Sequence, residues 1–284
     1  MAASMTAKEQ VMQQLESVEF PTPPAIVVRL VQLLAQEFVT SEEIGETMAL
    51  DAGMAARVLH LANSVALGGA APVDSIPEAV MRVGVDGVRD IVFALAMVGA
   101  MRPAHFDYRP FWRHSLAVAF TAQALQNRSL ELGASFPETY AGGLLHDIGM
   151  LVLDRTLGAQ YREVLELAKH SGRSLAEVEH EMLGTDHAVA GGRMLEAWRF
   201  PAVLVDAVRN HHQPWASGQV ITRVVHLADF VCNHQGIHHG TGFFPANCDP
   251  RVWDEFGLAV EDLPRILGEV QGELSRAEAV LANA

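Results

Sequence analysis

The chain has 284 residues, of which 50% are hydrophobic and 19% charged, so it is long and apolar enough for one large or two modest folded domains and far from the disordered class. Its formal net charge of -14, with 20 Lys and Arg scattered without a basic run, argues against a broad positive surface for nucleic acid. The sequence shows no signal-peptide pattern, no apolar window of about 20 residues that would predict a membrane span, and only two cysteines, which fits a reducing, cytoplasmic location.

Apolar residues recur at helical spacing along the chain. Leu30, Leu33 and Leu34 share one helical face, and the same spacing returns from Val80 onward. Helix starts are predicted where Ser or Thr is followed three residues later by Glu, because this pair can cap exposed backbone N–H groups. No convincing alternating strand pattern is present, so the sequence predicts an all-α fold. The predicted helix starts are Thr40/Glu43, Ser75/Glu78, Ser135/Glu138 and Ser174/Glu177.

Turn-forming residues divide the predicted helices at four places. The last of these, from Gly236 to Pro250, predicts a long loop that leads to a helical tail. Leu267, Val270 and Leu274 of that tail fall on one side of the helix, which can pack on the chain's own domain or pair with a second copy. We favour packing on its own domain. The other breaks are at Pro21–Pro24, Gly68-Gly69 with Pro72, and Arg102-Pro103.

The second half of the chain carries imidazole and carboxylate groups in apolar, helical surroundings. Asp147 directly follows His146 after Gly142-Gly143-Leu144-Leu145, where the glycines permit close helix packing and the pair is expected to be buried. A buried carboxylate needs a cation. The side chains of neighbouring helix residues point about 100° apart. His146 and Asp147 can therefore share an ion only if that ion lies beside their helix, or if Asp147 bridges two ions. The remaining donors would come from His114, His187, His211, His212 and Asp229.

Each of these positions has a plainer alternative. A single buried histidine is usually a hydrogen-bonded structural residue, so the metal prediction depends on agreement among several positions. His211-His212 could be a polar helix end that interacts with the helix dipole, which makes a second ion a weaker prediction than the first. Asn63-Ser64 is predicted to cap and turn rather than bind a ligand. Surface, loop or structural roles are predicted for His60, His105, His170, His180, His226, His234, His238 and His239.

The first hundred residues contain turn and cap positions but no pattern of reactive side chains. Pro and Gly separate the predicted helices, and Asn and Ser close them. These positions are Phe20-Pro21-Thr22-Pro23-Pro24, Leu50-Asp51-Ala52-Gly53, Leu61-Ala62-Asn63-Ser64, and Ser75-Ile76-Pro77-Glu78-Ala79-Val80 before Val83-Gly84-Val85.

These positions, taken together with the histidines of the second half, resemble the HDOD family, a helical bacterial signalling module related to the HD-type metal phosphohydrolases. The resemblance runs from about residue 18 to 235 and does not cover the tail. It implies an N-terminal helical bundle packed on an HD-type metal-binding helical domain. We therefore expect an N-terminal extension over residues 1–17, the bundle over 18–103, the HD-like subdomain over 104–235, and a loop with a helical tail over 236–284.

The resemblance also implies an arrangement of ligands. In the HD-GYP branch, which comprises cyclic-dinucleotide phosphodiesterases, two metals share a hydroxide that attacks phosphorus. Asp147, as the bridge, would be the catalytic residue. The donors favour one or two divalent transition-metal ions, iron or manganese first, with zinc, nickel and magnesium as alternatives. One metal would be held by His114, His146, Asp147 and Asp229, and the other by Asp147, His187, His211 and His212.

Two departures from the HD-GYP pattern bear on turnover. The lysine of that branch three residues after the Asp, which can help hold substrate phosphate, is Met150 here, and a thioether cannot replace its charge. After His212 the chain lacks the Glu and the later Gly-Tyr-Pro of that branch, and the acidic residue expected three positions after Asp229 is Cys232. Arginines could supply a positive group, although surface salt bridges are their commoner use. The candidates are Arg113, Arg155, Arg193 and Arg209.

Two functional hypotheses follow. The first is a signal-transduction module with a metal-binding site, which acts by binding a nucleotide, a cyclic dinucleotide or a signalling partner protein. The missing lysine and Gly-Tyr-Pro element favour it. The second is an active metal-dependent phosphohydrolase on a nucleotide or cyclic dinucleotide, which the retained His187 and His211-His212 favour. We prefer the first because an intact metal centre is necessary for hydrolysis but does not by itself hold a substrate.

Overall fold

The computed structural model describes residues 7–18, 20, 22–34, 36, 38–51, 53–63, 72–129, 138–241 and 248–282. The regular structure in these ranges is helical throughout, so the predicted all-α class is confirmed. None of the helices in these ranges is both long enough and apolar enough to cross a membrane.

The helices fall into an N-terminal and a C-terminal series. The first series is α1 (Ala7–Glu16), α2 (Ala25–Leu34), α3 (Ser41–Met48), α4 (Met54–Ala62), α5 (Ile76–Val83) and α6 (Val85–Ala100). The second is α7 (Tyr108–Ser129), α8 (Thr139–Leu145), α9 (Ile148–Leu157), α10 (Ala159–Ser171), α11 (Leu175–Leu183), α12 (His187–Ala197), α13 (Ala202–Asn210), α14 (Val220–His234), α15 (Pro250–Phe256), the 3-10 helix η3 (Val260–Asp262) and α16 (Leu263–Ala282).

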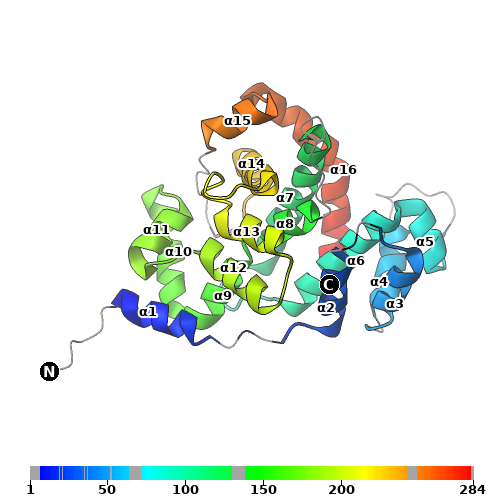
Figure 1. Cartoon of the computed structure of the whole chain (residues 1–284), viewed down its shortest axis with the longest axis horizontal. Helices are drawn as coiled ribbons and strands as arrows, with labels where there is room; N and C mark the ends of the chain where they lie inside the picture. Colours follow the sequence, from blue (N-terminus) through cyan, green and yellow to red (C-terminus); the bar gives the residue numbers. More distant parts are fainter. Residues whose placement is uncertain are drawn as a thin grey trace.

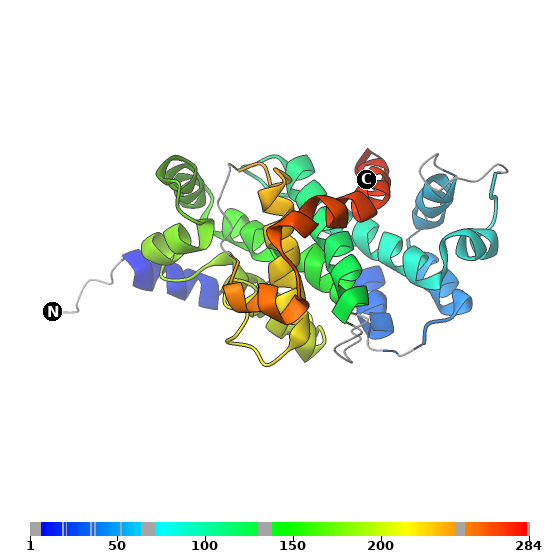
Figure 2. The same cartoon turned by 90° about the horizontal axis from the view of Figure 1, so that it is seen from above.

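The N-terminal helices lie at both ends of the molecule. Helices α2 to α5 gather at one end, whereas α1 lies at the other end beside α9 and α11, as two views at right angles show (Figures 1 and 2). Val11 and Leu15 of α1 are buried, so the predicted N-terminal extension packs on the second half of the chain. Helix α6 is buried on every side from Val88 to Val98, which makes it the centre of the N-terminal bundle.

The predicted helix starts are mostly observed. Two form complete capping boxes, in which the hydroxyl accepts from the backbone N–H of the Glu and the carboxylate accepts from the backbone N–H of the cap. At a third start the Ser75 hydroxyl accepts from the backbone N–H of Glu78. Ser135 of the fourth lies outside the described residues. The complete boxes are Thr40/Glu43 and Ser174/Glu177.

Where the structure describes them, the predicted breaks lie between helices. Arg102-Pro103 lies between α6 and α7. Asn63 ends α4, and its side-chain amide bonds both the backbone N–H and the carbonyl of Val73, at 2.6 and 2.7 Å. These bonds tie the end of α4 to Val73, in keeping with the predicted turn role. Ser64 and most of the break around residues 68–72 lie outside the described residues.

Helix α16 packs along α7 and also reaches α6 and α4 (Figure 1). Leu263, Ile266, Leu267 and Val270 are buried there, so packing of the tail on its own domain is confirmed. Leu274 has a side chain outside the described set. An apolar core runs without a break from α1 to α13, and the subdomain boundaries at residues 17, 103 and 235 stay predictions.

Backbone-to-backbone contacts position the turn between α8 and α9. A Cβ added to Gly149 would lie 1.8 Å from the carbonyl oxygen of His187, and one added to Gly143 would lie 2.6 Å from Cα of Ala119. Only glycine permits these approaches, which press α9 against α12 and α8 against α7. The expectation of close helix packing around the glycines is therefore confirmed.

Candidate metal centre

His146 and Asp147 lie in a tight turn rather than within one helix. Helix α8 ends at Leu145 and α9 begins at Ile148, and Asp147 takes the N-cap position with φ -94° and ψ 7°. The expectation that the two side chains diverge as helix neighbours is therefore wrong. Because the helix breaks between them, His146 Nε2 lies 3.2 Å from Asp147 Oδ2, and both side chains face one buried site.

One group of donors meets the Oδ2 side of Asp147. His114 comes from α7 and Asp229 from α14, and their Nε2 and Oδ1 atoms are 3.1 Å apart. His146 Nε2 lies 3.5 Å from the same Asp229 oxygen, and His114 Nε2 lies 3.6 Å from Asp147 Oδ2. These distances suit donors that surround one cation. We call His114, His146 and Asp229 the first donor group.

A second group meets the other oxygen of Asp147. His187, at the start of α12, places Nε2 3.1 Å from Asp147 Oδ1, and His211, just after α13, places its Nε2 3.7 Å from that oxygen. His212 Nε2 faces His187 Nε2 at 2.7 Å. The structure thus brings all seven predicted residues together, with one Asp147 oxygen toward each group. We call His187, His211 and His212 the second donor group.

Hydrogen bonds on the far side of each ring fix which nitrogen faces inward. A carbonyl oxygen is only an acceptor, so the Nδ1 beside it carries the proton and Nε2 is left with its lone pair. This is the usual outer arrangement of metal-bound histidine. The pairs are His114 with Ile237 O (2.8 Å), His146 with Gly143 O (2.8 Å), His211 with Val208 O (2.7 Å) and His187 with the carboxylate of Glu179 (2.6 Å).

The inward nitrogens fit a cation. The Nε2 atoms of His114, His146 and His211 are buried and have no hydrogen-bond partner among the described residues. An unsatisfied buried polar atom costs about 1–3 kcal/mol, and a metal ion gives such lone pairs a partner. His187 and His212 also point ring nitrogens at each other, which a shared cation would relieve.

Charges within the site are strongly coupled. Burial raises the pKa of Asp147 and Asp229, but the surrounding imidazoles outweigh it and hold both pKa values well below the usual range. Burial lowers the pKa of His146, yet the two carboxylates raise it to about 10. Without a cation this ring therefore carries a second proton on Nε2, which a bound metal ion would displace. Burial and the neighbouring His187 lower the pKa of His212 to about 3. The carboxylates therefore stay ionised and demand positive charge, which divalent cations would supply.

Glu179 was not predicted from the sequence. It is fully buried and accepts from the backbone N–H of His187 (2.9 Å), from the His187 ring (2.6 Å) and from the Tyr161 hydroxyl (2.6 Å). Nothing in the local sequence distinguishes it from the other acidic residues of α11. Its role depends on α11 packing beside the start of α12, which only the tertiary structure reveals.

Two histidines assigned to other roles also lie near the centre. His226 is structural, as expected, since its Nδ1 donates to His211 O (2.6 Å) and its Nε2 accepts from the backbone N–H of Asp249 (3.1 Å). His239 lies in a loop, as expected, but its side chain is buried and reaches the site, which sequence reasoning missed. Its ring meets that of His114 edge to face, with centroids 5.7 Å apart.

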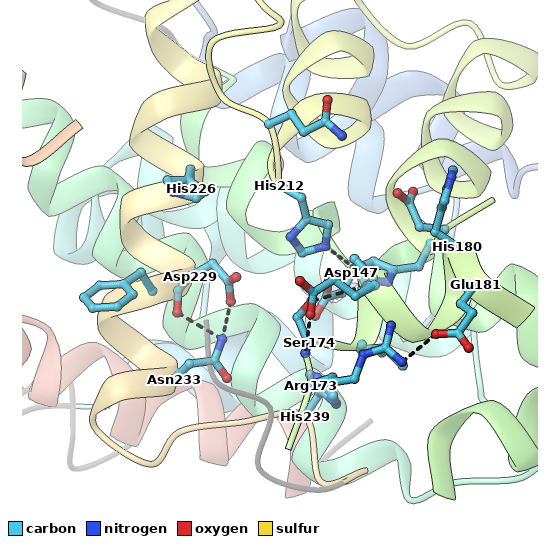
Figure 3. A pocket seen from close by; sticks show the side chains of 17 residues that line it. Asp147, Arg173, Ser174, His180, Glu181, His212, His226, Asp229, Asn233 and His239 are labelled. Carbon is cyan, nitrogen blue, oxygen red and sulfur yellow. Dashed lines mark hydrogen bonds and ion pairs between the residues drawn. The ribbon is translucent and has the colours of Figure 1, made fainter. Parts of the chain in front are cut away.

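A cavity of about 620 Å³ opens above the donors (Figure 3). Asp147, His212, Asp229 and His239 line its floor, and Arg173 lies at its wall, where Nη1 is 2.5 Å from Glu181 Oε2. Acidic and imidazole groups therefore dominate the cavity, with an arginine already paired.

None of the four arginines predicted as phosphate contacts lines this cavity in the described structure. Arg113 pairs with Glu278, and Arg209 pairs with Glu196, each at 2.9 Å, which confirms the surface salt-bridge alternative for these two. Met150 is fully buried in the core. The idea that a lysine at position 150 would hold a bound phosphate stays a prediction, and the native Met150 packs in the apolar core.

Comparison with known proteins identifies the family of the chain. A sequence model of the HDOD domain matches residues 20–214, well over half of the chain. An HDOD domain protein of unknown function from Geobacter sulfurreducens superposes with a TM-score of 0.77 at 26% identity, covering 96% of this chain and 97% of that one. An uncharacterised protein of Treponema pallidum is 20% identical over 194 residues, which are 68% of this chain and 38% of that protein. The chain thus spans well under half the length of this curated relative.

Two further structures share the fold at lower identity. A Marinobacter aquaeolei protein provisionally described as a signal transduction protein has a TM-score of 0.76 at 22% identity, covering 97% of this chain and 64% of its own. A Shewanella amazonensis protein provisionally described as a phosphohydrolase has a TM-score of 0.72 at 24% identity, covering 95% and 97%.

The helices and the buried His/Asp cluster define an all-α protein with donors that could hold a metal ion. The chain belongs to the HDOD family. The family and fold predicted from the sequence are thereby confirmed.

Proposed function

We propose that the chain is a metal-binding HDOD signalling module, which acts mainly by binding an anionic ligand or a partner protein and not by turnover. The observation that carries the metal site is the set of inward, unpartnered Nε2 atoms around Asp147, a carboxylate with one oxygen toward each donor group. When bound, divalent ions would supply positive charge to an oxyanion ligand and acidify a shared water.

The cavity favours binding over hydrolysis. The position of the HD-GYP lysine is the buried Met150, and the arginine at the cavity wall, Arg173, is engaged by Glu181. Catalysis requires stronger contacts to the transition state than to the ground state, and phosphoryl transfer relies on positive groups around the phosphate. A site with donors for metal but few unengaged cationic side chains in its described wall suits retention of a ligand better than its conversion.

The N-terminal helices offer a surface for a partner. Large apolar side chains are exposed there, with Phe38 81% and Met81 79% accessible, and Leu50 is 53% accessible. Contiguous exposed apolar patches mark interaction sites, whereas single exposed side chains are common on monomers, so these residues would act together as a docking surface. They support the idea that the bundle engages a signalling protein. The two free cysteines, Cys232 and Cys248, fit a cytoplasmic setting for that role.

A second candidate is an active metal-dependent phosphohydrolase on a nucleotide or cyclic dinucleotide. The specific observation that favours it is the completeness of the donor set, together with a cavity of about 620 Å³ directly above both groups. In this case Asp147 would be the residue that holds both metals around the attacking water.

One experiment separates the alternatives. Protein purified without added metal is analysed for bound first-row metals and is then assayed on cyclic dinucleotides and simple phosphodiesters. Bound metal without turnover supports the binding module, and bound metal with turnover that Asp147→Ala abolishes supports the phosphohydrolase. Absence of bound metal, even after reconstitution with iron, manganese or zinc, contradicts both.

A further inference from the structure

A second cavity, of about 520 Å³, adjoins the metal cavity, and we call it the side cavity. His212, Gln213 and His226 line both cavities. Because His212 belongs to the second donor group, the side cavity begins directly beside a metal donor. The rest of its wall, which the metal cavity does not share, includes Trp215 and Arg251. Its volume falls within the range of about 300–1,000 Å³ that small-molecule sites occupy.

His226 ties the side cavity to the metal centre. Its Nδ1 donates to His211 O at 2.6 Å, and its Nε2 accepts from the backbone N–H of Asp249 at 3.1 Å. His211 is a donor of the second group, and Asp249 is the N-cap of α15, the helix that carries Arg251. One buried imidazole thus sets the spacing between the donors and the wall of the side cavity. A ligand that is anchored at the metals meets this wall at a fixed distance.

Two guanidinium groups lie over the Trp215 ring. The Cζ atom of Arg251 is 4.9 Å from the centre of the ring, and the Cζ atom of Arg223 is 4.8 Å from it. The side chain of Arg223 is only 8% exposed, whereas that of Arg251 is 65% exposed. Arg223 therefore supports the ring from within the fold, and Arg251 forms the surface that a ligand meets. Planar bases stack on guanidinium groups as well as on aromatic rings.

The charges of both arginines are already balanced by carboxylates. Asp249 accepts from Nε and Nη2 of Arg251 at 3.0 and 2.6 Å. Glu255 accepts from Nε and Nη2 of Arg223 at 2.6 and 2.9 Å. Each two-point bond also fixes the orientation of its guanidinium plane. The wall therefore offers flat surfaces with little net charge, which suit an uncharged planar ring better than a second phosphate.

We propose that the side cavity binds the base of a nucleoside phosphate whose phosphate group is held at the metals. The base stacks on the guanidinium of Arg251, and Trp215 is the positioning residue that holds this group at the wall. This inference rests on the proposed metal-binding function and names the class of ligand, a phosphate ester joined to a planar heterocycle.

The test compares two probes on the full chain loaded with metal. Adenosine monophosphate carries a base, whereas ribose phosphate keeps the phosphate ester and the sugar without one. Calorimetric titration measures both affinities, and elemental analysis measures the metal content. Adenosine monophosphate should bind about tenfold more tightly than ribose phosphate or better, as expected for one stacked base.

Variants of Arg251 separate stacking from attraction between charges. Arg251→Ala should remove most of the preference for adenosine monophosphate and leave the affinity for ribose phosphate and the metal content unchanged. Arg251→Lys keeps the charge but not the plane, so it should lose the preference as well. Arg265→Ala is the matched control, since Arg265 is an exposed arginine of α16 that pairs with Asp262 and Glu269. It should change none of these quantities.

Variants of Trp215 test the support of the guanidinium. Trp215→Ala leaves Arg251 in the chain but removes the ring beneath it, so the preference for adenosine monophosphate should fall while ribose phosphate binds as before. Trp215→Phe keeps an aromatic face and should retain part of the preference.

Three results would overturn the inference. These are equal affinity of the native chain for the two probes, a full preference in Arg251→Ala, and native behaviour of Arg251→Lys. Each of them leaves the metal-binding function standing, because metal content and ribose phosphate affinity are measured separately. A native chain that takes up no metal contradicts both the proposed function and this inference.

Discussion

The two donor groups on either side of Asp147 provide negative charge in different ways. The first group contains a carboxylate of its own, Asp229, at 3.1 Å from His114. The second consists of three imidazoles, and its carboxylate, Glu179, lies behind His187 as a hydrogen-bond acceptor. Both arrangements supply one carboxylate per group besides the shared Asp147. The difference indicates that a cation in the first group would be held by direct charge, whereas one in the second would depend more on how firmly its rings are oriented.

Loss of the shared carboxylate should have the largest effect on both groups. Asp147→Ala removes an oxygen from each donor group and the buried charge that a cation offsets, so bound metal should fall to background. Elemental analysis checks this, with circular dichroism to verify that the helices persist. Asp254→Ala, at an exposed carboxylate on α15, is the control and should keep all its metal. Full metal content in Asp147→Ala would disprove the assignment of this residue.

Substitutions within one group should separate the two sites. Asp229→Ala is expected to lose the metal of the first group and keep that of the second, because His187, His211 and His212 retain Asp147. His212→Ala should lose the metal of the second group and keep that of the first. Metal stoichiometry and the spectrum of cobalt-substituted protein measure the outcome. If either variant loses all metal, the groups do not bind independently and the comparison between them fails.

A charge placed in the apolar core of α9 should destabilise the fold that carries both donor groups. Met150→Lys puts an ammonium in a fully buried position of α9, the helix that begins at Asp147, so the free energy of unfolding should fall by more than about 3 kcal/mol. Chemical denaturation measures it. Met150→Leu is the matched control and should cost less than about 1.5 kcal/mol. A stable Met150→Lys chain with stronger phosphate binding would support the idea that a lysine at this position holds the ligand.

The smallest expected effect is specific to the second group. Glu179→Gln keeps the size of the side chain but removes the charge that His187 faces, which should weaken one metal by about 10–100-fold and leave the other unchanged. Competition with a chelator of known affinity measures it. Tyr161→Phe removes a hydroxyl bound to the same carboxylate and should have a weaker effect in the same direction. Equal weakening of both metals would show that Glu179 does not distinguish the groups.

Much of the fold and of the candidate site follows from local sequence patterns. Helical spacing of leucines and valines predicted the all-α class, and the complete capping boxes at Thr40 and Ser174 start helices as expected. The seven donor positions were named from residue type and resemblance, and they converge in space. What the patterns missed depends on neighbours distant in the chain. Glu179 acts through His187, and the burial of Met150 follows from the packing of α9.

The break between His146 and Asp147 shows the limit of reading local sequence. Nothing in Leu144-Leu145-His146-Asp147 marks a helix end, and the turn is held by Gly149 against the backbone of His187. The turn places both side chains on one site, which an uninterrupted helix would not do. Periodicity could predict helices on both sides but not the one position where they are interrupted.

The sequence by itself determined the helices and the kinds of donor atom, because periodicity, capping and side-chain chemistry are local properties. The tertiary structure decided which ring nitrogens face inward, which carboxylates support them and that His239 joins the cavity. The physical reason is that a lone pair is aimed by the hydrogen bond on the opposite side of its ring. For His114 that bond is made to a carbonyl 123 residues further along the chain, where only the folded packing of α7 against the loop after α14 brings the two together.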